Sequence, residues 1–133
     1  MRIAIQADKV VHRNGERQSY SDRWAELARE RSVSVAWVDV TLQDALAQIR
    51  ECDGFMWRCS PTAFPRLLAK RVLPAIEQAC KIPIFPNWNS SWHFEDKIAQ
   101  TYLLAAAELP IPKTNIFWDR ANALRFIEEA PYP

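Results

Sequence analysis

Two predicted strands and the helix between them lie in residues 33–57, VSVAWVDVTLQDALAQIRECDGFMW. Residues 33–40 are rich in valine, which favours a strand, and apolar residues recur at helical spacing between 42 and 49. Asp53-Gly54 is a turn signal, and the short apolar run at 54–57 predicts another strand. A strand, a helix and a strand in this order predict a parallel pair of strands with a crossover helix.

The same alternation continues on both sides of this unit. Residues 2–6 predict a first strand, and residues 20–31 predict a helix behind a serine cap at Ser19 or Ser21. Further along, we expect a helix from about Thr62 to Cys80, bent or split near Arg71 by Pro74. Residues 82–85 then predict a fourth strand, residues 95–107 and 120–129 predict helices, and residues 114–117 predict an extended piece.

This pattern predicts an α/β fold with three layers. We expect an open, mainly parallel sheet of about four strands with helices on both faces, followed by a C-terminal strand-helix extension. The segment Leu109-Pro110-Ile111-Pro112 would interrupt any helix, so it is the expected domain boundary. The expected domains are residues 1–108 and 109–133. Trp24, Trp37 and Trp57 are expected in the core.

Composition excludes several classes of protein. Seventeen basic and sixteen acidic residues among 133 give a net charge of +1, which argues against a nucleic-acid or membrane-surface partner. The three cysteines form no Cys-x-x-Cys pair, so neither a disulfide framework nor a zinc site is predicted, and no metal ligands are assigned. Residues 1–7 do not resemble a signal peptide, and we expect a cytoplasmic protein. The sequence does not determine whether the chain forms a homodimer.

The scarcity of glycine limits the nucleotide sites that the chain can form. Gly15 and Gly54 are its two glycines. A Gly-x-Gly-x-x-Gly fingerprint needs three glycines, and a Walker loop needs two that lie five positions apart, so a Rossmann dinucleotide site and a P-loop are both excluded.

Ligands of open parallel sheets bind beyond the carboxyl ends of the strands. Here that region includes the basic loop after the first predicted strand, with Lys9, His12 and Arg13, and Arg58 after the third. Guanidinium and other cationic groups suit a carboxylate or a phosphate, so these four residues are candidate substrate-binding residues. The alternative interpretation is a solvated surface loop.

A family resemblance is carried by residues 82–117. Pro86-Asn87 ends a predicted strand, Glu95-Asp96-Lys97 opens a predicted helix, and Pro110-Ile111-Pro112-Lys113-Thr114 leads onward. This order resembles the entrance to the catalytic unit of ATP-grasp proteins, a superfamily of carboxylate ligases that needs neither of the excluded glycine motifs. The resemblance implies a pre-ATP-grasp, Rossmann-like domain at residues 1–108 and a truncated start of the nucleotide-binding domain at 109–133.

The resemblance also implies a function. The chain would be the N-terminal fragment of an ATP-dependent carboxylate-amine or carboxylate-thiol ligase that works through an acyl phosphate. It would supply the substrate-side wall and a phosphate-contacting lysine, and it would not be active alone. Its partners would be a small carboxylate substrate, ATP and the remainder of an ATP-grasp domain. Mg²⁺ would accompany ATP, with its ligands outside this sequence, and no catalytic residue is assigned.

Two lysines are carried over from the family pattern as candidate ATP contacts. Lys97 follows the aspartate that opens the helix, and Lys113 lies on the approach to the nucleotide-binding domain. A lysine beside the unpaired amides of a helix start can form an anion site. The alternative is that Glu95 and Asp96 neutralise this turn and leave Lys97 solvated. Thr114 is expected to have a structural role.

Two other functions compete with the ligase. One is a non-catalytic α/β domain that binds a ligand or a protein. The other is a receiver-like signalling domain, which requires paired acids after the first strand and an aspartate after the third. The sequence has Asp8 alone at the first place and Arg58 at the second, which argues against a receiver.

Overall fold

The computed structural model describes residues 1–7 and 19–131. The chain divides into two compact units, Met1–Phe94 and Glu95–Pro133. This division lies before the last predicted long helices, whereas the sequence places a domain boundary between residues 108 and 109. The boundary between residues 108 and 109 stays a prediction, because a group of residues in close contact with one another is not by itself a domain that folds independently.

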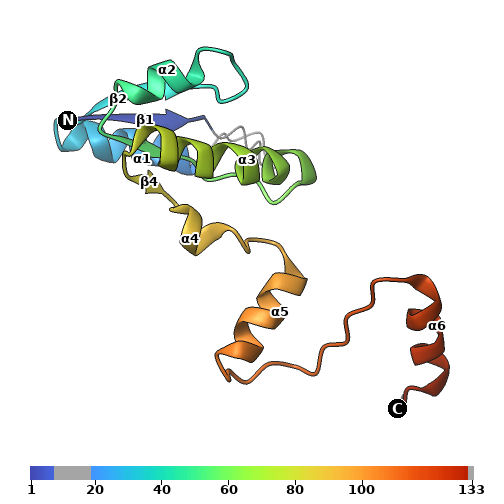
Figure 1. Ribbon diagram of the computed structural model, residues 1–133. Coiled ribbons are helices and arrows are strands. Elements are labelled where there is room, and N and C mark those ends of the chain that lie inside the picture. Colours follow the sequence, from blue (N-terminus) through green and yellow to red (C-terminus); the bar gives the residue numbers. More distant parts are fainter. Residues whose placement is uncertain (8–18, 132–133) are drawn as a thin grey trace, which may run out of the picture. The chain divides into compact units, whose positions relative to one another are not determined.

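The first unit is built on a four-stranded parallel sheet, which confirms the expected α/β class (Figure 1). The strand order is β2-β1-β3-β4. The strands are β1 (Arg2–Gln6), β2 (Ser34–Val38), β3 (Gly54–Met56) and β4 (Ile84–Phe85). Each parallel neighbour requires a crossover, and these crossovers are the helices of the unit.

Helices occupy the segments between the strands. In the first unit they are α1 (Tyr20–Glu30), α2 (Ala45–Arg50), α3 (Ala63–Cys80) and the short α4 (Trp88–Ser91), which the sequence pattern did not predict. Of the two alternatives for the third helix, the split is wrong, because α3 runs unbroken through Pro74, and the bend near Arg71 stays a prediction. Burial of Leu73 and Ile76 on either side of the proline holds this part of the helix against the core, which compensates for the missing backbone donor.

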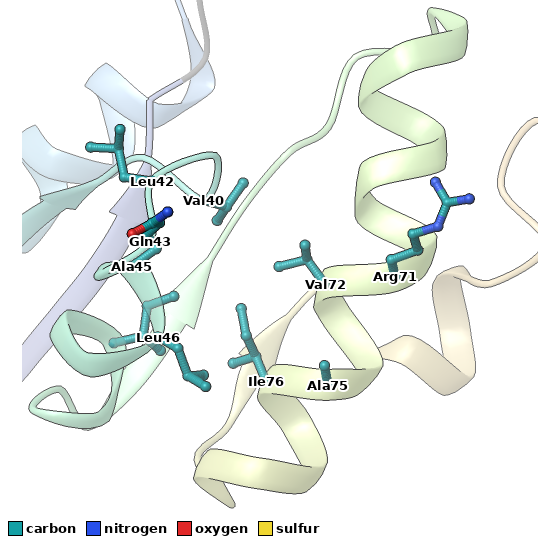
Figure 2. Close-up of a pocket in the computed structure, with 10 residues that line it drawn as sticks. Val40, Leu42, Gln43, Ala45, Leu46, Arg71, Val72, Ala75 and Ile76 are labelled. Atoms are coloured by element: carbon teal, nitrogen blue, oxygen red, sulfur yellow. The ribbon is translucent and has the colours of Figure 1, made fainter.

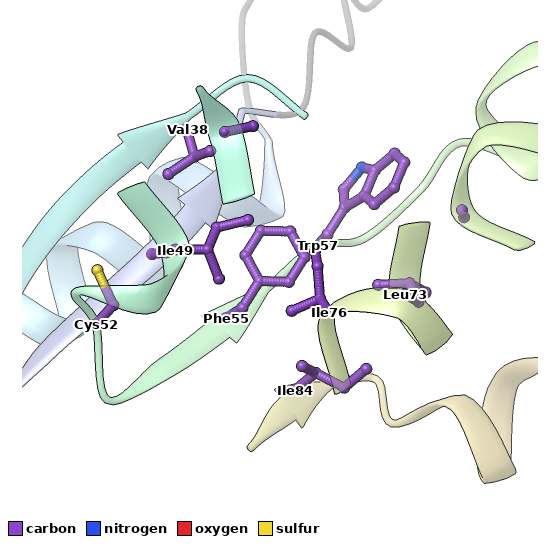
Figure 3. Close-up of a cluster of buried hydrophobic side chains, with 11 residues drawn as sticks. Val38, Ile49, Cys52, Phe55, Trp57, Leu73, Ile76 and Ile84 are labelled. Carbon is purple, nitrogen blue, oxygen red and sulfur yellow. The ribbon is translucent and has the colours of Figure 1, made fainter. Parts of the chain in front are cut away.

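One face of the sheet carries the main core (Figure 3). Four residues lie in register across all four strands, in the order Ala36, Ala4, Phe55 and Ile84. Ile49 of α2 and Leu73 and Ile76 of α3 pack in the same buried cluster, so both helices cover this face. Trp57 continues it and is buried as expected.

On the opposite face of the sheet, the centre is buried and the two edges are exposed. Its row reads Trp37, Ile5, Met56 and Phe85 from edge to edge, and the ring of Trp24 in α1 meets Phe85 edge-on at 5.8 Å. Ile5 in the middle is fully buried, but Trp37 is 48% exposed and Phe85 57% exposed. The expectation that Trp37 lies in the core is therefore wrong, because Trp37 lies on the edge strand β2, at one end of this row.

The second unit contains α5 (Lys97–Ala106) and α6 (Arg120–Glu129), joined by irregular chain through the prolines at 110 and 112. Asp96 and Asp119 cap the two helices by accepting bonds from backbone amides. Neither helix has a buried residue. The rings of Phe117 and Phe126 pack at a tilt of 46° with their centroids 5.2 Å apart, a contact that joins the irregular segment to α6.

The helices that the structure describes include none with both the length and the apolar character to cross a membrane.

Phe55 should contribute most to the stability of the first unit, since it lies in the centre of the main core and is 1% exposed. We predict that Phe55→Ala lowers the free energy of unfolding by about 3–5 kcal/mol, through lost apolar burial and the cavity left behind. Chemical denaturation followed by circular dichroism measures this loss. The matched control is Phe64→Ala on the surface of α3, 69% exposed, which should change stability by less than about 0.5 kcal/mol. Equal losses in both variants would contradict the assigned core.

Candidate functional site

The strand order creates a topological switch point between β1 and β3. The chain leaves β1 through α1 to β2 on one side, and it leaves β3 through α3 to β4 on the other. Connections that diverge in this way leave a position at the carboxyl ends of the two strands where ligands of open α/β sheets bind. The described residues there are Gln6, the last residue of β1, Ala7 directly after it, and residues 57–60 after β3.

Among the residues that the structure describes at this switch point, Arg58 is the cationic one. Its guanidinium carbon lies 4.2 Å from the centre of the Tyr20 ring, a cation-π arrangement. Stacking on an aromatic face fixes the plane of a guanidinium while its N–H groups point outward along the edge, the direction in which a carboxylate or phosphate binds. Tyr20 is 57% exposed and provides the aromatic face for this contact.

The start of α1 lies beside this pair and is held by buried hydroxyl groups. Ser19 caps the helix by accepting a bond from the amide of Asp22 at 3.1 Å, and its hydroxyl donates to the Asp22 carboxylate at 2.8 Å. The hydroxyl of Ser21 is 2.8 Å from that of Ser19, and both serines are buried. Because the single hydroxyl hydrogen of Ser19 is directed at Asp22, Ser21 is the donor. The network holds Tyr20 in place.

Gln6 connects the ends of two neighbouring strands, a role that the sequence did not reveal. Its side-chain oxygen accepts a bond from the amide of Val40 at 2.7 Å, and its amide group donates to Ala7 at 3.2 Å. A glutamine in a predicted strand carries no local signal for this bond, since Val40 is 34 positions away. The contact continues the β1–β2 ladder beyond the last strand residue.

Short polar side chains occupy the ends of the other two strands. The hydroxyls of Ser60 and Thr62 are 3.2 Å apart just after β3. After β4, Asn87 caps α4 by accepting a bond from the amide of Ser90 at 2.9 Å, and its carbonyl accepts one from the Ser91 hydroxyl at 2.7 Å. Among the described residues, the switch point therefore combines the guanidinium of Arg58 with neutral hydroxyl and amide groups, a set suited to one small anion.

Lys97, the first candidate for contact with ATP, belongs to the second unit. It is the first residue of α5, directly after the Asp96 cap, and its side chain is exposed. Its ammonium group donates to Gln100 at 3.1 Å. The position offers a cation beside the first amides of a helix, but Asp96 already accepts the bond of one of these, the amide of Ala99, at 3.0 Å.

Lys113, the second candidate, lies in the irregular chain between α5 and α6 and is exposed. Its neighbour Thr114 donates its hydroxyl to the carbonyl of Pro112 at 2.9 Å. This bond stabilises the local turn of the backbone and is consistent with a structural role for Thr114. Lys9, His12 and Arg13 lie outside the described residues, so their assignment to the substrate site stays a prediction.

Metal-binding and thiol chemistry find little support in the described part of the chain. Within residues 1–7 and 19–131, no group of three or more His, Cys, Asp or Glu side chains could hold a metal ion. Cys52, Cys59 and Cys80 are free thiols. Burial raises the pKa of the Cys52 thiol, with smaller contributions from nearby charges, so this cysteine is less reactive than usual.

An apolar cavity of about 220 Å³ lies between α2 and α3, on the core side of the sheet (Figure 2). Leu46 from α2 and Val72 and Ile76 from α3 point into it, whereas Arg71 lies at its rim. The switch point residues 6, 7 and 58 do not line the cavity, although Val40, whose amide donates to Gln6, does. Nothing in its lining suggests catalysis.

No protein-family model matches this chain, and no significant match to it is found among curated proteins or solved structures.

Loss of the Gln6 contact should be measurable as lost stability. We predict that Gln6→Leu lowers the free energy of unfolding by about 1–3 kcal/mol, because the part-buried amide of Val40 then lacks its acceptor. The control Gln48→Leu removes an exposed bond to Asp44 within α2 and should cost less than about 0.5 kcal/mol. Denaturant titration of both variants tests this, and a Gln6→Leu variant as stable as the original protein would refute the role of Gln6.

The cysteines should differ in reactivity. A raised pKa means a smaller thiolate fraction at any given pH, so Cys52 should be alkylated by iodoacetamide more slowly than Cys59 and Cys80 near pH 8. Its rate should also begin to rise at a higher pH. Mass spectrometry of peptides after timed labelling gives the three rates, and labelling in denaturant, where the rates should converge, is the control. Equal rates in the folded protein would contradict the buried position.

Proposed function

We propose that this chain forms the N-terminal part of an ATP-dependent carboxylate-amine or carboxylate-thiol ligase of the ATP-grasp type. The observation that carries the proposal is the order of its parts: a four-stranded parallel α/β unit is followed by an Asp96-capped helix with Lys97 in its first turn and then by the Pro-x-Pro-x-Thr segment. ATP-grasp proteins need neither of the glycine motifs that the sequence lacks, so the absence of these motifs is compatible with this way of binding a nucleotide.

The proposed reaction activates a carboxylate. A carboxylate oxygen of the substrate attacks the γ-phosphorus of ATP, which forms an acyl phosphate and releases ADP. An amine or thiol then attacks the acyl carbon, and inorganic phosphate leaves as the amide or thioester forms. Catalysis of the first step depends on cationic groups that stabilise the transferred phosphoryl group.

Lys97 is the proposed phosphate contact in this chain. Its bond to Gln100 is exposed to solvent, so a phosphate could replace Gln100 as its partner at little cost. The ammonium group would then act with the positive end of the α5 dipole. Lys113 is the second proposed contact, on the basis of its exposure and its place in the family pattern.

Arg58 is the proposed contact for the carboxylate substrate. The stacked Tyr20 ring restricts the guanidinium to one plane, which reduces the entropy lost when a planar carboxylate binds along its edge. The hydroxyls of Ser60 and Thr62 lie two and four residues further along the same loop and provide neutral hydrogen-bonding groups. Lys9, His12 and Arg13 are proposed to contribute from the preceding loop.

The apolar residues of the second unit support association with further protein. Tyr102, Leu103 and Leu104 of α5 and Leu124 and Ile127 of α6 are all substantially exposed, and neither helix has a buried residue. Apolar helix faces of this kind are stable when another protein surface covers them. The remainder of an ATP-grasp domain is the proposed cover.

The described residues fit the proposed cofactors in part. Lys97 and Lys113 could meet phosphate oxygens, whereas the described part of the chain has no cluster of acidic side chains for a metal ion. Mg²⁺ would therefore be held by residues of the nucleotide-binding domain outside the described residues, where it would neutralise phosphate charge.

A non-catalytic α/β domain that binds a ligand or a protein is the second candidate function. The observation that favours it is the first unit itself, which has its own buried cluster across four strands and two helices. Such a unit could use the Arg58–Tyr20 pair to hold an anion without transferring a phosphoryl group.

The test is ATP turnover by the natural polypeptide that carries this sequence. We expect release of ADP that depends on an added carboxylate, and formation of a hydroxamate when hydroxylamine replaces the amine. Lys97→Gln should lower kcat/KM for ATP about tenfold to hundredfold, as expected for loss of a charged hydrogen bond. The control Lys81→Asn removes one exposed charge from the end of α3, where asparagine tolerates the left-handed backbone, and should leave turnover unchanged.

Different outcomes would overturn different parts of this proposal. If no carboxylate from a broad panel stimulates ADP release, the ligase function is wrong and the binding domain takes its place. If turnover is carboxylate-dependent but Lys97→Gln behaves as Lys81→Asn does, the function stands and the role of Lys97 is wrong.

A further inference from the structure

The outer edge of β2 presents backbone groups for another strand. β2 is the last strand of the sheet, and the amide of Ser34 donates inward to the carbonyl of Met1 at 3.2 Å. Because backbone groups alternate along a strand, the even-numbered residues of β2 face β1, and the N–H and C=O groups of Val35 and Trp37 face outward. The amide of Val40, which is also an even-numbered residue, likewise points toward β1, where it donates to Gln6.

The other edge of the sheet, at β4, does not present backbone groups to another strand in this way. The carbonyls of Pro83 and Phe85 accept bonds from β3, so the outward positions on β4 are Ile84 and Pro86. Pro86 has no N–H group, and β4 is two residues long. Short strands and prolines are common means of preventing a sheet edge from pairing. The two edges therefore differ in their capacity to add a strand.

β2 lacks the features that protect an edge strand. Its sequence, SVAWV, has no charge and no proline, and none of the described strands covers its outer side. Trp37 is 48% exposed on the α1 side of the sheet, beside the outward backbone groups. An uncharged apolar edge of this kind favours pairing with another chain.

We propose that β2 pairs antiparallel with β2 of a second copy of this chain, about a twofold axis at Ala36. This register places Val35 of each copy opposite Trp37 of the other. Val35 and Trp37 are the residues whose backbone groups face outward, so each opposed pair exchanges both of its N–H···O=C bonds. The aromatic and β-branched side chains also meet on one face, a favourable cross-strand pair.

The charges that flank β2 favour two antiparallel copies of it. Arg31 lies at the end of α1, three residues before the strand, with an exposed side chain 4.0 Å from Glu30, and Asp39 lies directly after the strand and accepts bonds from Thr41. Antiparallel pairing brings the start of one strand beside the end of the other, so Arg31 of each copy approaches Asp39 of its mate at both ends. Parallel pairing would bring like charges together. A twofold interface is also the commonest arrangement in soluble oligomers.

The first test is the mass of the full chain in solution by sedimentation or light scattering. We expect twice the chain mass of 15.4 kDa at high micromolar concentration. Trp37→Lys should reduce this to a single chain mass, because the twofold axis brings two lysines into the interface. The matched control is Phe85→Lys, which changes the equivalent exposed residue of the same row at the opposite edge, and it should remain dimeric.

A cross-linking test checks the register and does not require a destabilising substitution. With the axis at Ala36, the two Ala36 Cα atoms lie about 4.5 Å apart as a non-hydrogen-bonded pair, within reach of a disulfide. Ala36→Cys should therefore form a covalent dimer under mild oxidation. In the control Ser34→Cys the two new thiols belong to residues roughly 13 Å apart, so no additional dimer should form beyond that of the original protein.

Three results would overturn the proposal. They are a single chain mass for the original protein at high concentration, a dimer that Trp37→Lys does not weaken, and equal cross-linking of the two cysteine variants. Circular dichroism of each variant shows that a change in mass does not come from unfolding.

Discussion

Parallel pairing of β1 with both β2 and β3 is the constraint on which the rest of the structure depends. Parallel neighbours cannot be joined by a tight turn, so each pairing requires a helix over one face of the sheet. Because β2 and β3 lie on opposite sides of β1, the helices cover both faces and the chain connections diverge at the carboxyl ends of β1 and β3. The same pairing produces the core, the switch point with Arg58, and the outer edge of β2.

The two faces of the sheet are not covered equally, and this difference determines where the surface can interact. α2 and α3 together bury the row that contains Phe55, whereas α1 buries the centre of the other row and leaves Trp37 and Phe85 substantially exposed at its ends. At the β4 end, Pro86 limits pairing with another strand. At the β2 end no such residue occurs in the strand, and the backbone groups of Val35 and Trp37 are directed outward.

Local sequence patterns predicted most of the elements because the signals are local. The residues of α6 agree with the predicted range, and those of α1 and α5 agree to within two residues, since serine or aspartate caps and helical periodicity act over a few residues. The predictions were less accurate where contacts between residues distant in sequence determine the local structure. Pro74 predicted a bent or split helix, but Leu73 and Ile76 pack into a core contributed by other elements and α3 continues without a break. Gln6 gave no sign of its bond to an amide 34 residues away.

The sequence alone determined the α/β class, the positions of the long helices and the absence of glycine-rich nucleotide motifs, because periodicity and composition are properties of the chain itself. Only the tertiary structure decided which strands are edges, which side of the sheet leaves Trp37 half exposed, and that Arg58 stacks on Tyr20. These features depend on strand order and on which residues distant in sequence become neighbours. That outcome is set by the summed packing of all the elements.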